Sequence, residues 1–188
     1  MTSAESMFAV GEIEVRGETL KTFTNAPATL GDVWALASMH GDKTYLIYED
    51  ESWSYTQAYA ETASIVNWMH ANDIKQGDRV AIPKGSGGMV FNVIGMHPIH
   101  NRGGLGITVV GMNAWWVTDE MQYGLEDSAP KAFIADIERL ERFLPVRDQF
   151  PDMKVIGLRL PEPVEGVIDY TDLKNHGGEM PKVDVDGD

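Results

Sequence analysis

One glycine-rich segment has the residue types that could bind phosphate. Pro83-Lys84-Gly85-Ser86-Gly87-Gly88 follows an apolar run, and a glycine-rich loop after a strand can hold phosphate oxygens with backbone amides. The nucleotide-binding template requires glycine, four residues and then Gly-Lys-Ser/Thr, and that order is absent. A flexible connection is therefore the favoured interpretation of Lys84–Gly88, and a phosphate site is the alternative.

Two histidines, His97 and His100, lie beside Met96 and could suggest a metal site. Ligands on one helical face favour a spacing of four residues, and no further metal-binding side chain is clustered nearby. Pro98 separates the histidines and favours a loop. Asp184–Asp188 has carboxylates like those of a calcium loop but lacks the downstream glutamate. We therefore predict no metal site.

Patterns typical of nucleophilic or acid–base catalysis are missing from the sequence. It contains no cysteine, which excludes thiolate nucleophiles, disulfide frameworks and cysteine-based zinc sites. There is no Gly-x-Ser-x-Gly elbow and no recognisable Ser–His–Asp order. Glu126 and Asp127 are adjacent acids, but they fall at a predicted helix end where solvation is expected. The residues taken alone identify no catalytic group and no cofactor-binding group.

Composition limits the partners. The 188 residues include 15 basic and 29 acidic side chains, giving a net charge of −14. That charge repels nucleic acids, so no nucleic-acid partner is expected. The longest nearly apolar stretch, Met89–Met96, is far shorter than the roughly 20 residues of a membrane span. Met1–Val15 lacks the features of a secretory signal, so we expect a cytoplasmic protein.

Four apolar runs predict strands: Arg79–Ile82, Ile107–Val110, Lys131–Ala135 and Lys154–Leu158. Strands that are apolar throughout are typical of parallel sheets covered on both faces. Because predicted helices separate these runs, we expect an α/β fold with a largely parallel sheet flanked by helices.

Helix signals lie on either side of those strands. Thr29 is a predicted N-cap, and Ser54 with Gln57 fits a capping box for a helix reaching about residue 71. Thr118 is predicted to cap a helix to about residue 125, and a further helix covers 137–144. The predicted buried faces are Leu30, Val33, Trp34 and Ala37 in the first helix, and Ala58, Thr62, Ile65, Val66 and Met69 in the second.

The remaining segments define a predicted division of the chain. Residues 1–27 are expected to form an arm with a short strand at best, 28–160 an α/β subdomain, and 161–188 an acidic Pro/Gly-rich tail of loop character. A hairpin is expected over 44–55. Residues 83–106 are expected to be irregular with a break at Pro98; a reading-frame error or decay of the gene would also explain that stretch.

Four segments in order carry a family resemblance: Tyr45–Tyr59, Gly77–Ile82, Ile107–Trp116 and Glu120–Asp136. Together they resemble the N-terminal part of the acyl-CoA synthetases, members of the adenylate-forming (AMP-binding) superfamily. Asn113-Ala114-Trp115-Trp116 is most similar to the fatty acyl branch. Both tryptophans are expected to pack beneath the following helix.

The resemblance implies a carboxylate substrate such as a fatty acid, with ATP, Mg²⁺ and coenzyme A as cofactors of the full-length family. It also implies an incomplete N-terminal subdomain, because the family's phosphate-binding loop would be expected shortly after Asp188. We therefore expect this chain to bind no cofactor and to be inactive alone.

Two other interpretations remain open. The chain could be a non-catalytic ligand-binding or interaction module derived from that fold, self-associating through an exposed sheet edge. It could also be a truncated gene product without a stable function.

Overall fold

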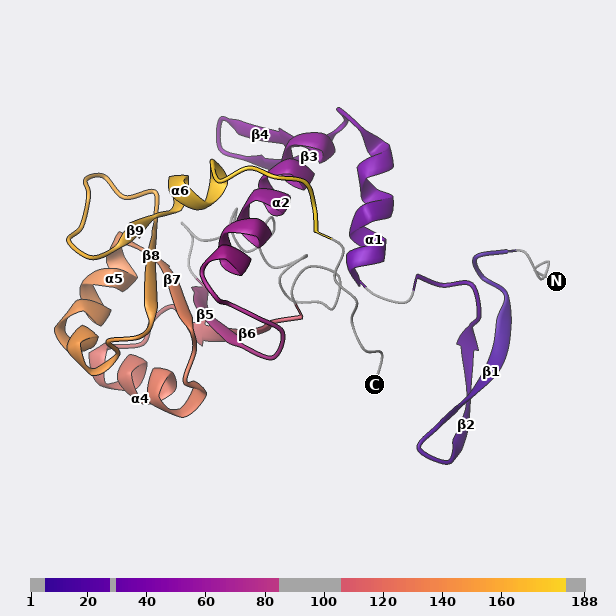
Figure 1. The fold of residues 1–188 in the computed structure, drawn as a ribbon, viewed down its shortest axis with the longest axis horizontal. Coiled ribbons are helices and arrows are strands. Elements are labelled where there is room, and N and C mark those ends of the chain that lie inside the picture. Colours follow the sequence, from indigo (N-terminus) through magenta and orange to yellow (C-terminus); the bar gives the residue numbers. More distant parts are fainter. Residues whose placement is uncertain (1–5, 28–29, 85–105, 182–188) are drawn as a thin grey trace.

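The computed structural model describes residues 6–27, 30–84 and 106–181 (Figure 1). The described α-helices are α1 (Leu30–Ala37), α2 (Tyr55–Ala71), α4 (Thr118–Ser128), α5 (Ile137–Phe143) and α6 (Tyr170–Lys174). Two 3₁₀ helices are η1 (Ser38–His40) and η3 (Leu144–Gln149). The strands are β1 (Val10–Val15), β2 (Glu18–Phe23), β3 (Thr44–Tyr48), β4 (Glu51–Ser54), β5 (Arg79–Lys84), β6 (Thr108–Asn113), β7 (Ala132–Asp136), β8 (Lys154–Leu158) and β9 (Ile168–Asp169).

A five-stranded sheet is the centre of the fold. Its strand order is β6-β5-β7-β8-β9, and every neighbouring pair is parallel. The four predicted strands are therefore neighbours in one parallel sheet, and this prediction is confirmed. The longest pairing runs from Arg79 opposite Thr108 to Lys84 opposite Asn113, with six residues on each strand.

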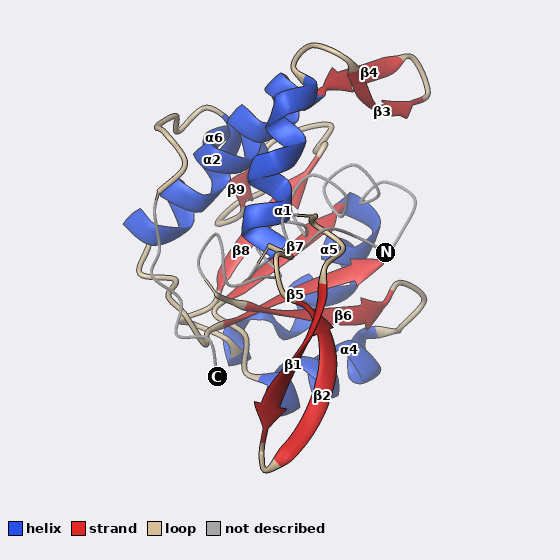
Figure 2. Ribbon diagram, turned by 90° about the vertical axis from the view of Figure 1, so that its right-hand side faces the viewer, coloured by secondary structure: helices blue, strands red, loops and turns tan. Residues whose placement is uncertain are grey.

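Helices cover both faces of this sheet, α2 and α6 on one and α4 and α5 on the other (Figures 1 and 2). Successive strand residues point to opposite faces, so Val80 and Ile82 pack toward α2 while Ala81 packs toward α4 and α5. This double coverage explains why the interiors of β5, β7 and β8 are apolar rather than alternating.

Helix α2 begins as predicted. The Ser54 hydroxyl accepts a hydrogen bond from the Gln57 amide at 3.1 Å, and the Gln57 side chain accepts one from the Ser54 amide at 2.9 Å. The predicted buried face of α2 is confirmed for all five residues: Ala58, Thr62, Ile65, Val66 and Met69.

Helix α4 begins differently from the prediction. Val117, not Thr118, is its N-cap residue, and its amide donates to the Glu120 carboxylate at 3.0 Å. The Thr118 hydroxyl instead donates to the Arg142 carbonyl at 2.9 Å. The hydroxyl that was predicted to cap α4 is therefore used in a tertiary contact with the end of α5.

The N-terminal segment contains more structure than the predicted short strand. β1 and β2 form an antiparallel hairpin of two six-residue strands, and β3 and β4 form the second, predicted hairpin. In α1, Trp34 is buried at 6% exposure but Val33 is 46% exposed. The predicted buried face of α1 is thus wrong for Val33.

Residues beyond 160 are not only loop. β9 extends the sheet beside β8, and α6 follows with Leu173 fully buried in the core. The expectation of a loop is therefore wrong for Ile168–Lys174. The predicted break at Pro98 lies outside the described residues.

Candidate functional site

The carboxyl edge of the parallel sheet is the first candidate region, because open α/β sheets bind ligands beyond the carboxyl ends of their strands. β5 ends at Lys84 and β6 at Asn113, which are opposite each other in the sheet. The Asn113 side-chain oxygen accepts a hydrogen bond from the Trp115 amide at 3.0 Å. Asn113 therefore shapes the turn that leaves β6.

Two arginines of α5 hold the same turn. Arg139 Nε and Arg142 Nη1 both donate to the Ala114 carbonyl, at 3.2 and 2.9 Å. Arg139 is 4% exposed, and its guanidinium forms ion pairs with Asp136 at 3.1 Å and with Glu138 at 2.7 Å. A buried guanidinium requires such partners. Both arginines are thus engaged in fixing the turn.

The two tryptophans of this turn have different environments. Trp116 packs over α4 so closely that a Cβ added at Gly124 would lie 2.6 Å from its Cζ3 atom. Trp115 is 77% exposed, with the Arg139 guanidinium 6.0 Å from its ring centroid. The expectation that both pack beneath the helix is right for Trp116 and wrong for Trp115, because glycine at position 124 leaves room for the Trp116 ring against α4 while Trp115 faces solvent.

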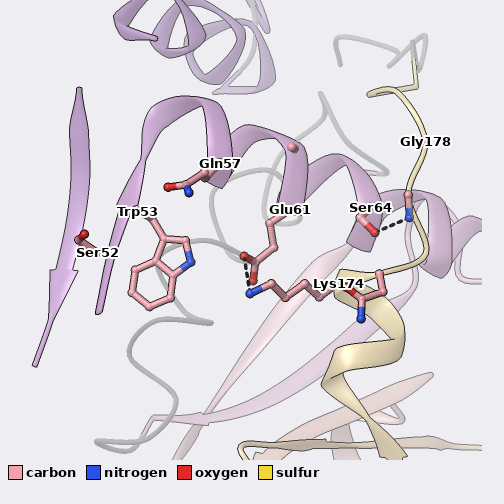
Figure 3. A pocket seen from close by; sticks show the side chains of 10 residues that line it. Ser52, Trp53, Gln57, Glu61, Ser64, Lys174 and Gly178 are labelled. Carbon is pink, nitrogen blue, oxygen red and sulfur yellow. Dashed lines mark hydrogen bonds and ion pairs between the residues drawn. The ribbon is translucent and has the colours of Figure 1, made fainter. Parts of the chain in front are cut away.

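A second candidate region is a hollow of about 440 Å³ between α2, β4 and the chain around α6 (Figure 3). Figure 3 shows Glu61 of α2 and Lys174 of α6 pointing toward each other, with the Trp53 indole beside them. The hollow is lined by Ser52, Trp53, Gln57, Ala60, Glu61, Ser64, Lys174, Asn175, Gly177 and Gly178.

Glu61 is the acidic residue that lines this hollow, and it is 7% exposed. It accepts a hydrogen bond from the Tyr170 hydroxyl at 2.5 Å, and Lys174 Nζ lies 3.6 Å from its other oxygen. Burial, and then the charge of Glu61, raise the pKa of Tyr170 well above the usual tyrosine range. The phenol therefore stays protonated and serves as a hydrogen-bond donor rather than as an acid or base.

Polar side chains of α2 also fix the chain after α6. The Ser64 hydroxyl donates to the Leu173 carbonyl and accepts from the Gly177 amide, both at 2.7 Å. The Asn67 side-chain amide donates to the carbonyl of Glu179 at 2.9 Å. Glu61, Ser64 and Asn67 thus form one polar row on α2, and each finds its partners in residues 170–179.

Most of the sequence-predicted candidates lie outside the described residues. Lys84 ends β5, whereas Gly85–Gly88, Met96, His97, His100 and Asp184–Asp188 lie outside the described residues. Glu126 and Asp127 are exposed at the end of α4, as expected. Over the described ranges, no group of three or more metal-ligating side chains occurs.

The side chains that the sequence did not single out are those of the two networks: Glu61, Tyr170, Lys174, Arg139 and Arg142. One signal was available for Glu61, which directly precedes Thr62 of the predicted buried face. Its partner Tyr170 is 109 residues away in sequence, and no local pattern connects them.

One comparison with known proteins identifies a family. The model of the AMP-binding enzyme family matches residues 33–185. No curated protein matches the chain.

Similar solved structures include a protein described as a long-chain-fatty-acid CoA ligase from Rhodopseudomonas palustris, with 19% identity and a TM-score of 0.66. The match covers 82% of this chain and 37% of that one. The anthranilate CoA ligase AuaEII, solved with anthranoyl-AMP, gives 19% identity, a TM-score of 0.69, and coverage of 85% and 31%. A benzoate CoA ligase from Burkholderia xenovorans gives 13% identity and a TM-score of 0.65. That match covers 81% of this chain and 29% of the ligase. The chain thus spans about a third of the length of these proteins.

Proposed function

The chain belongs to the AMP-binding enzyme family, and we propose that it is the N-terminal part of an ATP-dependent ligase that joins a fatty acid to coenzyme A. In that reaction the carboxylate attacks the α-phosphate of ATP and releases pyrophosphate, and the CoA thiol then displaces AMP. The observation that supports the proposal most is the all-parallel sheet in the order β6-β5-β7-β8-β9 within the matched residues. The tandem Trp115-Trp116 supports the fatty acyl branch.

We propose that these residues contribute a wall of the enzyme rather than its phosphate clamp. A triphosphate needs a focused cluster of cations and backbone amides. Arg139 and Arg142 are held by carbonyls and carboxylates of their own surroundings. Lys174 faces Glu61. Within the part of the chain that the structure describes, the cations nearest the two candidate regions are therefore already engaged.

The test of this proposal measures pyrophosphate release by purified 1–188 with ATP, Mg²⁺ and fatty acids of several lengths. We expect no fatty-acid-dependent release and at most weak ATP binding by calorimetry, because the chain carries a net charge of −14. Lys84→Ala is the control. Robust turnover that this substitution abolishes would contradict the proposal and would place the active site in the glycine-rich segment.

A second experiment tests the family role separately from inactivity. The genomic sequence downstream of codon 188 should encode, in frame or after a frameshift, a Ser/Thr/Gly-rich loop ending in Pro-Lys-Gly. A downstream sequence without that loop would favour the alternative function, a non-catalytic ligand-binding or interaction module. The open outer edge of β6 in the described sheet is the surface through which such a module would associate with itself.

The division into an arm (1–27), a subdomain (28–160) and a tail (161–188) is proposed as well, with the tail supplying β9 and α6. No helix in the described part of the chain is long and apolar enough to cross a membrane. A cytoplasmic location is the proposal that fits the composition, and fractionation of cells expressing the tagged chain would test it.

A further inference from the structure

The hairpin β1–β2 has two open edges. It projects away from the rest of the described chain (Figure 1), and neither strand pairs with a third strand in the described residues. A two-stranded hairpin is marginally stable in water, and three or more strands are usually needed. This hairpin also exposes apolar side chains on both of its faces, with Ile13 at 45%, Leu20 at 50% and Phe23 at 53%.

The pairing pattern shows which backbone groups these edges offer. The Thr24 amide donates to the Ala9 carbonyl at 2.9 Å, and the hairpin register continues from that pair. Hydrogen-bonded and non-hydrogen-bonded pairs alternate in an antiparallel ladder. The amide and carbonyl groups of the intervening residues therefore point outward: Val10, Glu12 and Glu14 on the β1 edge, and Thr19, Lys21 and Phe23 on the β2 edge.

Charge distinguishes the two edges. Two copies of β1 paired about their centre would place Glu12 opposite Glu12 or opposite Glu14, and like charges directly opposite are destabilising. Two copies of β2 paired about Leu20 place Thr19 opposite Lys21 twice and Leu20 opposite Leu20. No like charges face each other in this register. The outward amide and carbonyl groups of Thr19 can hydrogen-bond with those of Lys21 in the second copy.

We propose that β2 pairs antiparallel with β2 of a second copy of the chain, with Leu20 on the two-fold axis. The two hairpins then form one four-stranded sheet. Because Ile13 is opposite Leu20 within each hairpin, one face of that sheet carries a continuous apolar row of Ile13, Leu20, Leu20 and Ile13 across the four strands. The opposite face keeps the Glu12–Lys21 pair of each copy.

A single cysteine gives the sharpest test, because the chain contains no cysteine. In Leu20→Cys the two sulfurs would lie in a non-hydrogen-bonded pair with Cα atoms about 4.5 Å apart, which a disulfide can span. In the control Ile13→Cys the two residues would be three strand spacings, about 14 Å, apart. Under mild oxidation we expect a disulfide-linked dimer of Leu20→Cys and monomeric Ile13→Cys on a non-reducing gel.

Proline substitutions test the same edge without cross-linking. Thr19→Pro removes an outward amide on β2, and Glu14→Pro removes one from its cross-strand partner on β1; neither amide bonds within the hairpin. By sedimentation equilibrium we expect the unchanged chain to dimerise and Thr19→Pro to weaken the dimer about tenfold or more, since two symmetry-related hydrogen bonds are lost. Glu14→Pro should leave the dimer unchanged.

Four results would overturn the proposal: an unchanged chain that is monomeric by sedimentation equilibrium, a Leu20→Cys variant that stays monomeric, equal cross-linking of Ile13→Cys, or equal weakening by both prolines.

Discussion

The N-terminal region before residue 48 and the sheet region from α2 onward differ in the exposure of their apolar side chains. Among the described residues, eleven of the fourteen exposed large apolar side chains lie before residue 48. The buried apolar residues of that region are Ala9 and Trp34. In the sheet region, by contrast, Phe133, Ile65 and Met69 are all completely buried.

This difference shows that local structure and burial have separate causes. The N-terminal hairpin forms because a two-residue turn with positive φ at Arg16 and Gly17 matches the twist of its strands. Turn geometry does not supply a surface to cover Val10 or Phe23. In the sheet region, helices on both faces of the sheet supply such a surface. The stability of that region therefore depends on tertiary packing.

The largest predicted effect is truncation of a core aromatic. Phe133 is fully buried, with its ring centroid 4.9 Å from that of Phe143. Phe133→Ala should lower the free energy of unfolding by about 3–5 kcal/mol because it leaves a cavity. The same change at Phe23, 53% exposed, should cost less than about 1 kcal/mol. Urea denaturation measures both, and similar losses would remove the contrast between the regions.

A smaller effect is expected at the polar contact between α2 and α6. Tyr170→Phe removes the donor to the buried Glu61 carboxylate and should cost about 1–3 kcal/mol. Because burial raises the pKa of Tyr170, the unfolded chain ionises first, at a pH of about 10. Stability should therefore be intact at pH 8 and decrease above about pH 10.

Urea denaturation between pH 8 and 11 tests both parts of that prediction. Tyr170→Phe should reduce the alkaline loss without abolishing it, because burial also raises the pKa of Tyr45. Tyr123→Phe, at an exposed position, is the matched control and should behave like the unchanged chain. An identical pH slope in Tyr170→Phe would show that a raised pKa of Tyr170 does not contribute to the alkaline loss of stability.

Substitutions at two glycines separate the cost of overpacking from the cost of an unfavourable backbone conformation. At Gly124 an added Cβ would meet the Trp116 ring at 2.6 Å, so Gly124→Ala should cost about 1–3 kcal/mol by overpacking. Gly17 has open space around it but a φ of +83°, so Gly17→Ala should cost about 1 kcal/mol through backbone strain. Thermal unfolding followed by tryptophan fluorescence should detect the Gly124 change, whereas the Gly17 change should alter far-UV dichroism alone.

The smallest effect is expected at the boundary between the two regions. Ser54→Ala removes the N-cap hydroxyl of α2 and should lower the free energy of unfolding by about 1 kcal/mol. Ser54→Asp, which keeps an acceptor, should restore it. If Ser54→Ala is neutral while Ser54→Asp is destabilising, the capping box has no stabilising role here.

Local signals in the sequence were sufficient for several elements. The Ser54–Gln57 capping box acts within four residues, and its predicted hydrogen bonds are present. The apolar runs inside β5, β7 and β8 predicted parallel strands, because strands covered on both faces have apolar interiors rather than an alternating pattern. The order of motifs also identified the family, which the matched residues 33–185 confirm.

The candidate regions depended on contacts that no local signal encodes. Trp115 and Trp116 are adjacent and chemically identical, yet the arginines of α5 and the space above Gly124 leave one exposed and cover the other. The segment after residue 160 reads as loop because its helix has only five residues, too few to form without tertiary support.

The sequence by itself determined the strands β5, β6, β7 and β8, the start of α2 and the family, since these depend on periodicity, on neighbours a few residues apart and on the order of short motifs. Only the tertiary structure decided that Tyr170 and Lys174 meet Glu61 across more than a hundred residues, and that the N-terminal apolar side chains remain uncovered by the described residues. Burial of a given side chain is a property of the assembled surfaces around it, and those surfaces come from segments distant in the chain.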